Sequence, residues 1–156
     1  MSIGLVDTSI FCEIVPVPGR NQHREAVLAK LEDHIRSNVT LLLPIATILE
    51  TGNHIAHISD GRQRRITATR FVELVQPALG DLGSPPPWTV PHPLLDPQNL
   101  QHYLSKFPDY AMQGIGLGDL SIIEEYDRQC RLHRARHVFI WSLDHHLAAY
   151  KRPAQM

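Results

Sequence analysis

The chain has 156 residues, a length typical of a single domain, and its content of 43% hydrophobic and 20% charged residues is that of an ordinary globular protein. The formal net charge is -1, with a sequence pI of about 6.8. This balance excludes a global positive field that would draw the protein to nucleic acid, so contact with a polyanion must be local or mediated by a metal ion.

The N-terminal segment, MSIGLVDTSIFCEI, has no basic residues and two acidic ones, which is not the pattern of a signal peptide. The longest apolar run, 41–49, is too short to span a bilayer and contains a proline. Cys12 and Cys130 form no C-x-x-C motif, so neither a disulfide framework nor a zinc knuckle is indicated. We therefore expect a cytoplasmic protein that makes no contact with membranes.

The first half of the chain alternates short apolar runs with helical patterns. Ile3 to Val6 predicts a buried strand followed by a loop, and 22–36 has the apolar spacing of an amphipathic helix. Val39 to Leu43 predicts a second buried strand, after which Pro44 suits the first turn of another helix. Gly61 opens a further helix that ends near Pro77 to Gly80. Its expected inward residues are Ile66, Phe71, Leu74 and Val75.

The second half begins with an excursion and returns to the same alternation. Most of the prolines lie between Pro85 and Pro108, so 81–117 predicts a mainly irregular segment with one short helix near 97–107. Helical spacing follows at 120–133, then a strand at 138–141 and a short helix from about 144 to 150. These elements predict one α/β domain over 1–152, with a mainly parallel central sheet, helices on both faces, a proline-rich insertion or lid at 81–113 and a tail at 153–156.

Four acidic residues are placed where a parallel sheet would gather them. Asp7 and Asp144 each follow a buried strand, Asp119 follows the glycine run GIGLG before a helix, and Glu50 lies about two turns into the helix that begins near Pro44. Ligands bind at the carboxyl ends of parallel strands, and each of these positions leads to that edge. Each aspartate is also a good helix N-cap, so capping is an alternative reading for all three. Glu50 caps nothing, and four gathered carboxylates favour a hard cation such as Mg²⁺ or Mn²⁺.

Four segments together resemble the PIN-domain nucleases, in particular the short VapC-type toxins of toxin–antitoxin pairs. GLVDTSIF is similar to the opening strand of that family, with Asp7 as its acid. LLLPIATILETGNHI resembles the second strand and helix, with Glu50, and GLGDLSII resembles the third motif, with Asp119. VFIWSLDHHL looks like the closing strand, with Ser142 and Asp144. The order holds over about 3–150, and residues 81–113 are longer and richer in proline than in compact members of the family.

The resemblance implies a PIN-like domain that hydrolyses RNA phosphodiester bonds with a divalent metal ion. Asp7, Asp119 and Asp144 would hold Mg²⁺ or Mn²⁺, and Glu50 would orient or deprotonate the attacking water. The resemblance also implies a toxin of a type II toxin–antitoxin pair, with RNA as substrate, a small antitoxin protein as partner, and a homodimer.

Other interpretations of the same residues stay open at this point. A PIN-like fold without catalysis would serve as an RNA- or protein-binding module. An aspartyl phosphotransferase or phosphatase is a further alternative, although Ser9 stands where that chemistry needs a second aspartate, and no lysine follows a strand. His54 and His57 have the spacing of a metal pair but no third ligand nearby in the sequence. Arginines near 62–65 and 128–136 suit either RNA contact or a solvated helix face.

Overall fold

A computed structural model of the chain describes residues 1–80, 84–91 and 97–156. Its strands are β1 (Ser2–Val6), β2 (Thr40–Leu42), β3 (Trp88–Thr89), β4 (His137–Trp141) and β5 (Lys151–Arg152). Its helices are α1 (Thr8–Ile14), α2 (Arg24–Arg36), α3 (Ile45–Ala56), α4 (Gly61–Val75), α5 (Pro97–Met112), α6 (Leu117–Leu132) and α7 (His145–Ala148), with a 3-10 turn at Gln76–Ala78. None of the helices in these described ranges is long and apolar enough to cross a membrane.

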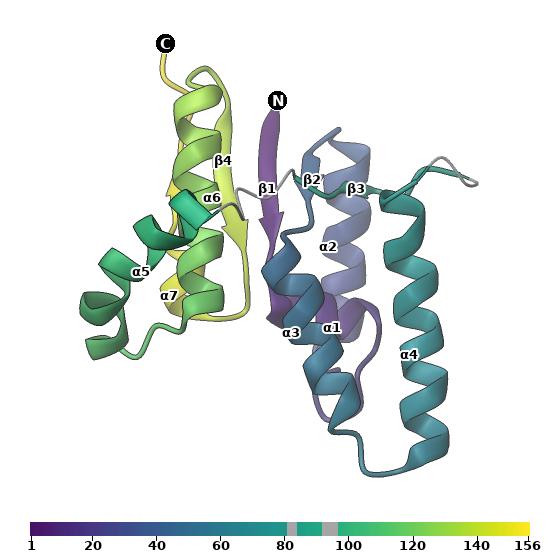
Figure 1. Ribbon diagram of the computed structural model, residues 1–156. Coiled ribbons are helices and arrows are strands. Elements are labelled where there is room, and N and C mark those ends of the chain that lie inside the picture. Colours follow the sequence, from purple (N-terminus) through teal and green to yellow (C-terminus); the bar gives the residue numbers. More distant parts are fainter. Residues whose placement is uncertain (81–83, 92–96) are drawn as a thin grey trace.

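The strands form one sheet in the order β3-β2-β1-β4-β5, with β1 at its centre (Figure 1). β1 pairs in parallel with both β2 and β4, and β2 pairs in parallel with β3, whereas β5 runs antiparallel to β4. The arrowheads of β1 and β4 therefore point to the same edge, where α1 begins. This edge receives the residues that follow β1, β2 and β4.

Apolar side chains cover both faces of the sheet. Ile3 and Leu5 point to one face, where they pack with Ile122 and Ile123 of α6. Val6 lies on the other face, in a cluster to which α1, α2, α3 and α4 contribute. Because neighbouring residues of a strand point to opposite faces, a continuous apolar run is what a strand buried on both sides requires. The predicted α/β class, with a mainly parallel sheet and helices on both faces, is confirmed.

The centre of the sheet depends on one glycine. A Cβ at Gly4 would lie 2.7 Å from the Phe139 ring and 3.2 Å from the Leu41 side chain. The missing side chain lets the ring of β4 cover the middle of β1. On this face Phe139 and Trp141 also flank the buried His34 of α2, at ring distances of 5.4 and 4.7 Å.

Three expectations about local structure are wrong. The residues after β1 form helix α1 and not a loop, and nearly all its residues are buried. Ile66 of α4 is exposed, while Thr67 faces the core. The segment 81–117 is not mainly irregular, because β3 extends the sheet beside β2 and α5 occupies sixteen residues. Positions 81–83 and 92–96 of that segment lie outside the described residues.

Candidate functional site

Asp7 is held at the end of β1 by two serine hydroxyls, one from α1 and one from the residue that follows β4. It is only 3% exposed, and it caps α1 by accepting a hydrogen bond from the Ser9 backbone N–H. Its Oδ2 also accepts from the hydroxyls of Ser9 and Ser142, each at 2.8 Å. All three bonds fall on Oδ2, so they orient the carboxylate without occupying Oδ1. The expected capping role is confirmed, and the two serines link the ends of β1 and β4.

Asp144 follows β4 and is fixed by the same serine. Its backbone N–H donates to the Ser142 hydroxyl at 2.9 Å. Its side chain caps α7 by accepting from the His146 N–H at 2.8 Å. The Asp144 side chain is exposed, so it reaches solvent at the sheet edge while Asp7 lies beneath.

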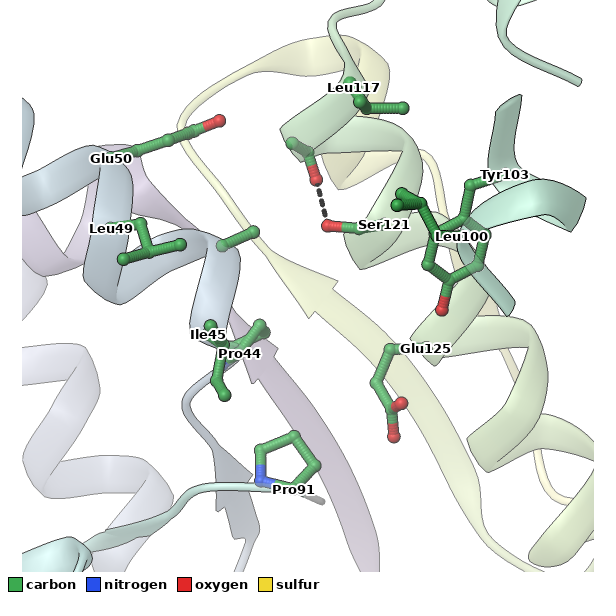
Figure 2. Close-up of a pocket in the computed structure, with 12 residues that line it drawn as sticks. Pro44, Ile45, Leu49, Glu50, Pro91, Leu100, Tyr103, Leu117, Ser121 and Glu125 are labelled. Atoms are coloured by element: carbon green, nitrogen blue, oxygen red, sulfur yellow. Dashed lines mark hydrogen bonds between the residues drawn. The ribbon is translucent and has the colours of Figure 1, made fainter. Parts of the chain in front are cut away.

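Glu50 extends from α3 toward the first turn of α6. Figure 2 shows its carboxyl group pointing across to the part of α6 where Leu117 lies. The Glu50 Oε2 accepts a hydrogen bond from the Thr8 hydroxyl at 2.8 Å. A Cβ at Gly118 would overlap Glu50 Oε1 and lie 2.9 Å from Glu50 Cδ. The Glu50 carboxylate therefore lies between α1 and α6. It occupies the space that a side chain larger than glycine at position 118 would fill.

Asp119 lies inside the first turn of α6, not before it. The N-cap residue is Gly116, which makes no side-chain cap hydrogen bond, so the prediction that Asp119 caps this helix is wrong. The pKa of Asp119 is raised from 3.8 to about 6. Burial is the largest cause, and the negative charges of Asp7, Glu50 and Asp144 add to it. That the other three acids act on Asp119 shows that the four carboxylates share one electrostatic environment.

The four predicted acids line the same cavity, of about 350 Å³, at the carboxyl edge of the sheet. In the described parts of the chain, no group of three or more His, Cys, Asp or Glu side chains is already arranged to bind a metal ion. The donor chemistry nevertheless fits a hard divalent cation, because carboxylate oxygens dominate and Asp119 is held against three like charges. Cys12 is a poor competitor as a ligand, since burial raises the pKa of its thiol to about 11.

The cavity also includes Arg20, which no sequence pattern indicated, and His54, one of the two histidines with the spacing of a metal pair. Arg20 lines it from the segment between α1 and α2, and His54 lines it from α3, one turn beyond Glu50. Burial and the charge of Arg20 lower the pKa of His54, so this imidazole is neutral at neutral pH. His57 is directed elsewhere, with its Nδ1 2.7 Å from the Asn53 carbonyl oxygen. A lone arginine in an exposed turn has no periodic or motif signal, which is why Arg20 was missed.

The arginine-rich end of α6 lies away from the acids. Arg128 pairs with Glu125 at 3.0 Å, and the C-terminus of α6 leads into the start of β4. Asp144 follows the opposite end of the same strand. This cluster is therefore at the far edge of the sheet and does not border the cavity.

An apolar cleft of about 280 Å³ adjoins the acidic cavity, and Glu50 lines both. Figure 2 shows Leu49 on α3, Leu117 on α6, and Leu100 and Tyr103 on α5 around this cleft. Leu49 is 62% exposed and Leu100 is 42% exposed. Large apolar side chains of this exposure, grouped around a cleft, are typical of a binding surface.

Comparison of the chain with protein-family models, with curated proteins and with solved structures gave no match. The function must therefore be inferred from the chemistry of the cavity and from the sequence motifs.

Proposed function

We propose that the protein is a divalent-metal-dependent endoribonuclease, the toxin of a toxin–antitoxin pair, with its active site in the acidic cavity. The observation that supports this most strongly is the convergence of Asp7, Glu50, Asp119 and Asp144 on one cavity, with the pKa of Asp119 raised by burial and by the other three charges. Carboxylates that repel one another destabilise a fold unless a cation is bound between them. The same four residues are those of the PIN-like motifs.

The metal ion, Mg²⁺ or Mn²⁺, would be held by Asp7, Asp119 and Asp144. When bound, it supplies positive charge that stabilises the developing negative charge on the phosphate and lowers the pKa of bound water. Ser9 and Ser142 keep the Asp7 carboxylate oriented for this role through their hydrogen bonds to Oδ2. With a cation bound, Asp119 is expected to be ionised at neutral pH.

Glu50 is the proposed general base. It stands on a different element from the three metal-binding aspartates and is fixed by the Thr8 hydroxyl. It would accept a proton from the attacking water as the water oxygen forms its bond to phosphorus. The P–O3′ bond then breaks, and the 3′ oxygen leaves with a proton from solvent. The products are a 5′-phosphate and a 3′-hydroxyl.

The aspartyl phosphotransferase alternative has less support. Ser9, at the position where that chemistry needs a second aspartate, donates its hydroxyl hydrogen bond to Asp7. None of the three lysines, Lys30, Lys106 and Lys151, is among the residues that line the cavity. Lys106 instead pairs with Glu124 at 2.7 Å.

The ribonuclease proposal is tested with single-stranded RNA in Mg²⁺ or Mn²⁺, with chelator as the blank. The parent protein is expected to release fragments with 5′-phosphate and 3′-hydroxyl ends, and Asp7→Asn is expected to release none. A contaminating metal-independent ribonuclease would leave 2′,3′-cyclic phosphates and would persist in chelator. Equal cleavage by the parent and by Asp7→Asn would refute the assignment.

The apolar cleft supports the second part of the proposal, a small antitoxin protein as partner. An apolar helix face that binds there would cover Glu50 and so block the acidic cavity. Leu49→Asp is expected to weaken binding of the product of the adjacent reading frame and to leave RNA cleavage intact. The implied homodimer is a separate proposal, which light scattering of the purified chain tests.

A further inference from the structure

The cavity that contains the four carboxylates has a second end, which contains an arginine. Residues from the turn between α1 and α2, among them Arg20 and His23, line it together with His54 of α3. Arg20 acts electrostatically on Cys12 and His54, whereas the groups that act on Asp119 are the other three acids. Arg20 therefore enters the cavity from the side of α3 and of the turn between α1 and α2, whereas Asp119 and Asp144 lie at the starts of α6 and α7.

The turn that presents Arg20 is anchored by its own hydrogen bonds. The Arg20 backbone N–H donates to the Val17 carbonyl at 2.9 Å, and the Gln22 side chain donates to the Gly19 carbonyl at 2.8 Å. The turn needs glycine at position 19, where φ is +83°. At its far end the His23 N–H donates to the buried carboxylate of Glu13 at 3.2 Å. Arg20 is thus placed by a fixed backbone.

The guanidinium itself is available to a ligand. Within residues 1–80, 84–91 and 97–156, the ion pairs join other side chains, and Arg20 has neither an ion pair nor a side-chain hydrogen bond. Its side chain is exposed although several carboxylates line the same cavity. Arginine binds phosphate oxygens through two parallel N–H groups, and its charge is independent of pH in the range where proteins fold.

We propose that Arg20 forms a subsite for an RNA phosphate adjacent to the one that is cleaved. This inference rests on the proposed ribonuclease function and adds to it a substrate contact that no motif indicated. An RNA strand entering this cavity brings several negative phosphates, but a metal ion at the aspartates neutralises only the scissile one. The flanking phosphate would meet Glu50 and Glu13 without compensation unless the Arg20 guanidinium binds it. The subsite selects a charged backbone over an uncharged analogue.

The alternative is that Arg20 only offsets the charge of the neighbouring carboxylates. It would then change metal affinity or stability but would not distinguish one phosphate of the substrate from another. A neutral methylphosphonate placed at single positions of the RNA separates the two roles, because it removes one negative charge from the substrate and none from the protein.

The test uses a short single-stranded RNA with one mapped cleavage site, in versions with one methylphosphonate at each flanking position. For the parent, one flanking methylphosphonate is expected to raise KM about tenfold with little change in kcat, the loss of one charged hydrogen-bonded contact. Arg20→Ala should show that tenfold increase with ordinary RNA and no further increase with that methylphosphonate. Arg20→Lys should lie between them. Arg36→Ala, in which an exposed partner of Asp33 is removed, is the matched control and should behave as the parent.

Salt dependence gives a second measurement of the same contact. The slope of log affinity against log salt concentration is expected to become shallower by about 0.7 in Arg20→Ala, as for one phosphate contact on a single strand. If each methylphosphonate raises the KM of Arg20→Ala by the same factor as that of the parent, the subsite is refuted. The ribonuclease assignment is not affected by that result. Absence of metal-dependent cleavage by the parent would overturn both.

Discussion

Gly118→Ala separates the stability of the protein from the position of Glu50. The new Cβ would overlap Glu50 Oε1, and because this atom ends a flexible side chain, the carboxylate can turn away without moving a helix. Alanine in place of glycine favours a helix by about 0.5–1 kcal/mol. Loss of the hydrogen bond from Thr8 to Glu50 at 2.8 Å costs about 1–2 kcal/mol in a partly buried setting. The free energy of unfolding should therefore fall by about 0–1.5 kcal/mol.

Activity should respond much more strongly than stability. A displaced general base is expected to lower kcat by about 10- to 100-fold with little effect on KM. Gly52→Ala is the matched control, because it lies in α3 two residues from Glu50 and has open space where its Cβ would be. That variant should be more stable than the parent by about 0.5–1 kcal/mol and fully active.

The assay pairs thermal or urea unfolding with steady-state cleavage of single-stranded RNA in Mn²⁺. In a double-mutant cycle, Gly118→Ala should add no further loss of kcat to Glu50→Ala, since both changes remove the same group from its position. Losses that multiply would refute the reasoning, as would a Gly118→Ala variant with the kcat of the parent.

Asp119→Asn is expected to stabilise the metal-free protein at neutral pH. Folded Asp119 keeps its proton up to about pH 6, whereas the unfolded chain releases it near pH 3.8. The free energy of unfolding therefore falls as pH rises between these values, and the protein stays less stable by that amount at higher pH. For this half-buried group the gain should be about 1–2 kcal/mol in chelator and should vanish below pH 4. Equal midpoints at neutral pH would contradict the shift. Mn²⁺ at a concentration about one hundred times its Kd should raise the free energy of unfolding of the parent by about 2.7 kcal/mol. The same Mn²⁺ concentration should stabilise Asp119→Asn much less, and scanning calorimetry measures both effects. Thr8→Val removes the hydroxyl that holds Glu50, so kcat should fall several-fold at unchanged KM; a larger change in KM than in kcat would argue that Thr8 contacts the substrate.

The sheet and three of its strand ends could be predicted because burial on both faces leaves a continuous apolar run that stops at a polar residue. Ile3 to Val6 ends at Asp7 for this reason, and 138–141 leads to Asp144 by way of Ser142. Helix α1 could not be predicted in the same way. Its residues are buried nearly all round, so it has no polar face and therefore no helical period. Apolar residues alone do not distinguish such a segment from a loop or a strand.

The start of α6 was misplaced for a different reason. Glycines at 114, 116 and 118 indicate a flexible segment, and helix propensity alone would begin the helix after them. The structure begins it at Leu117, with Gly118 already helical, and the Glu50 carboxylate from α3 occupies the space that a side chain at position 118 would fill. That contact joins residues 68 positions apart, and no local pattern encodes it. The proline-rich segment before α6 was predicted to be mainly irregular, yet Pro97 opens α5 and Pro108 lies within that helix.

The departures from local preference fall in one place, and this bears on function. A glycine stands in the first turn of a helix, an aspartate in that turn is held against three like charges, and a carboxylate is buried at the end of the central strand. Charge repulsion at Asp119 lowers stability and could be relieved by asparagine, whereas the other two features depend on contacts with Glu50, Ser9 and Ser142 around the same cavity. A chain selected only for a stable scaffold would have no reason to keep all three around the same cavity. Proteins depart from local rules chiefly where a site requires it, so their coincidence favours a cation-binding catalytic site over a binding module with an incidental cluster of acids.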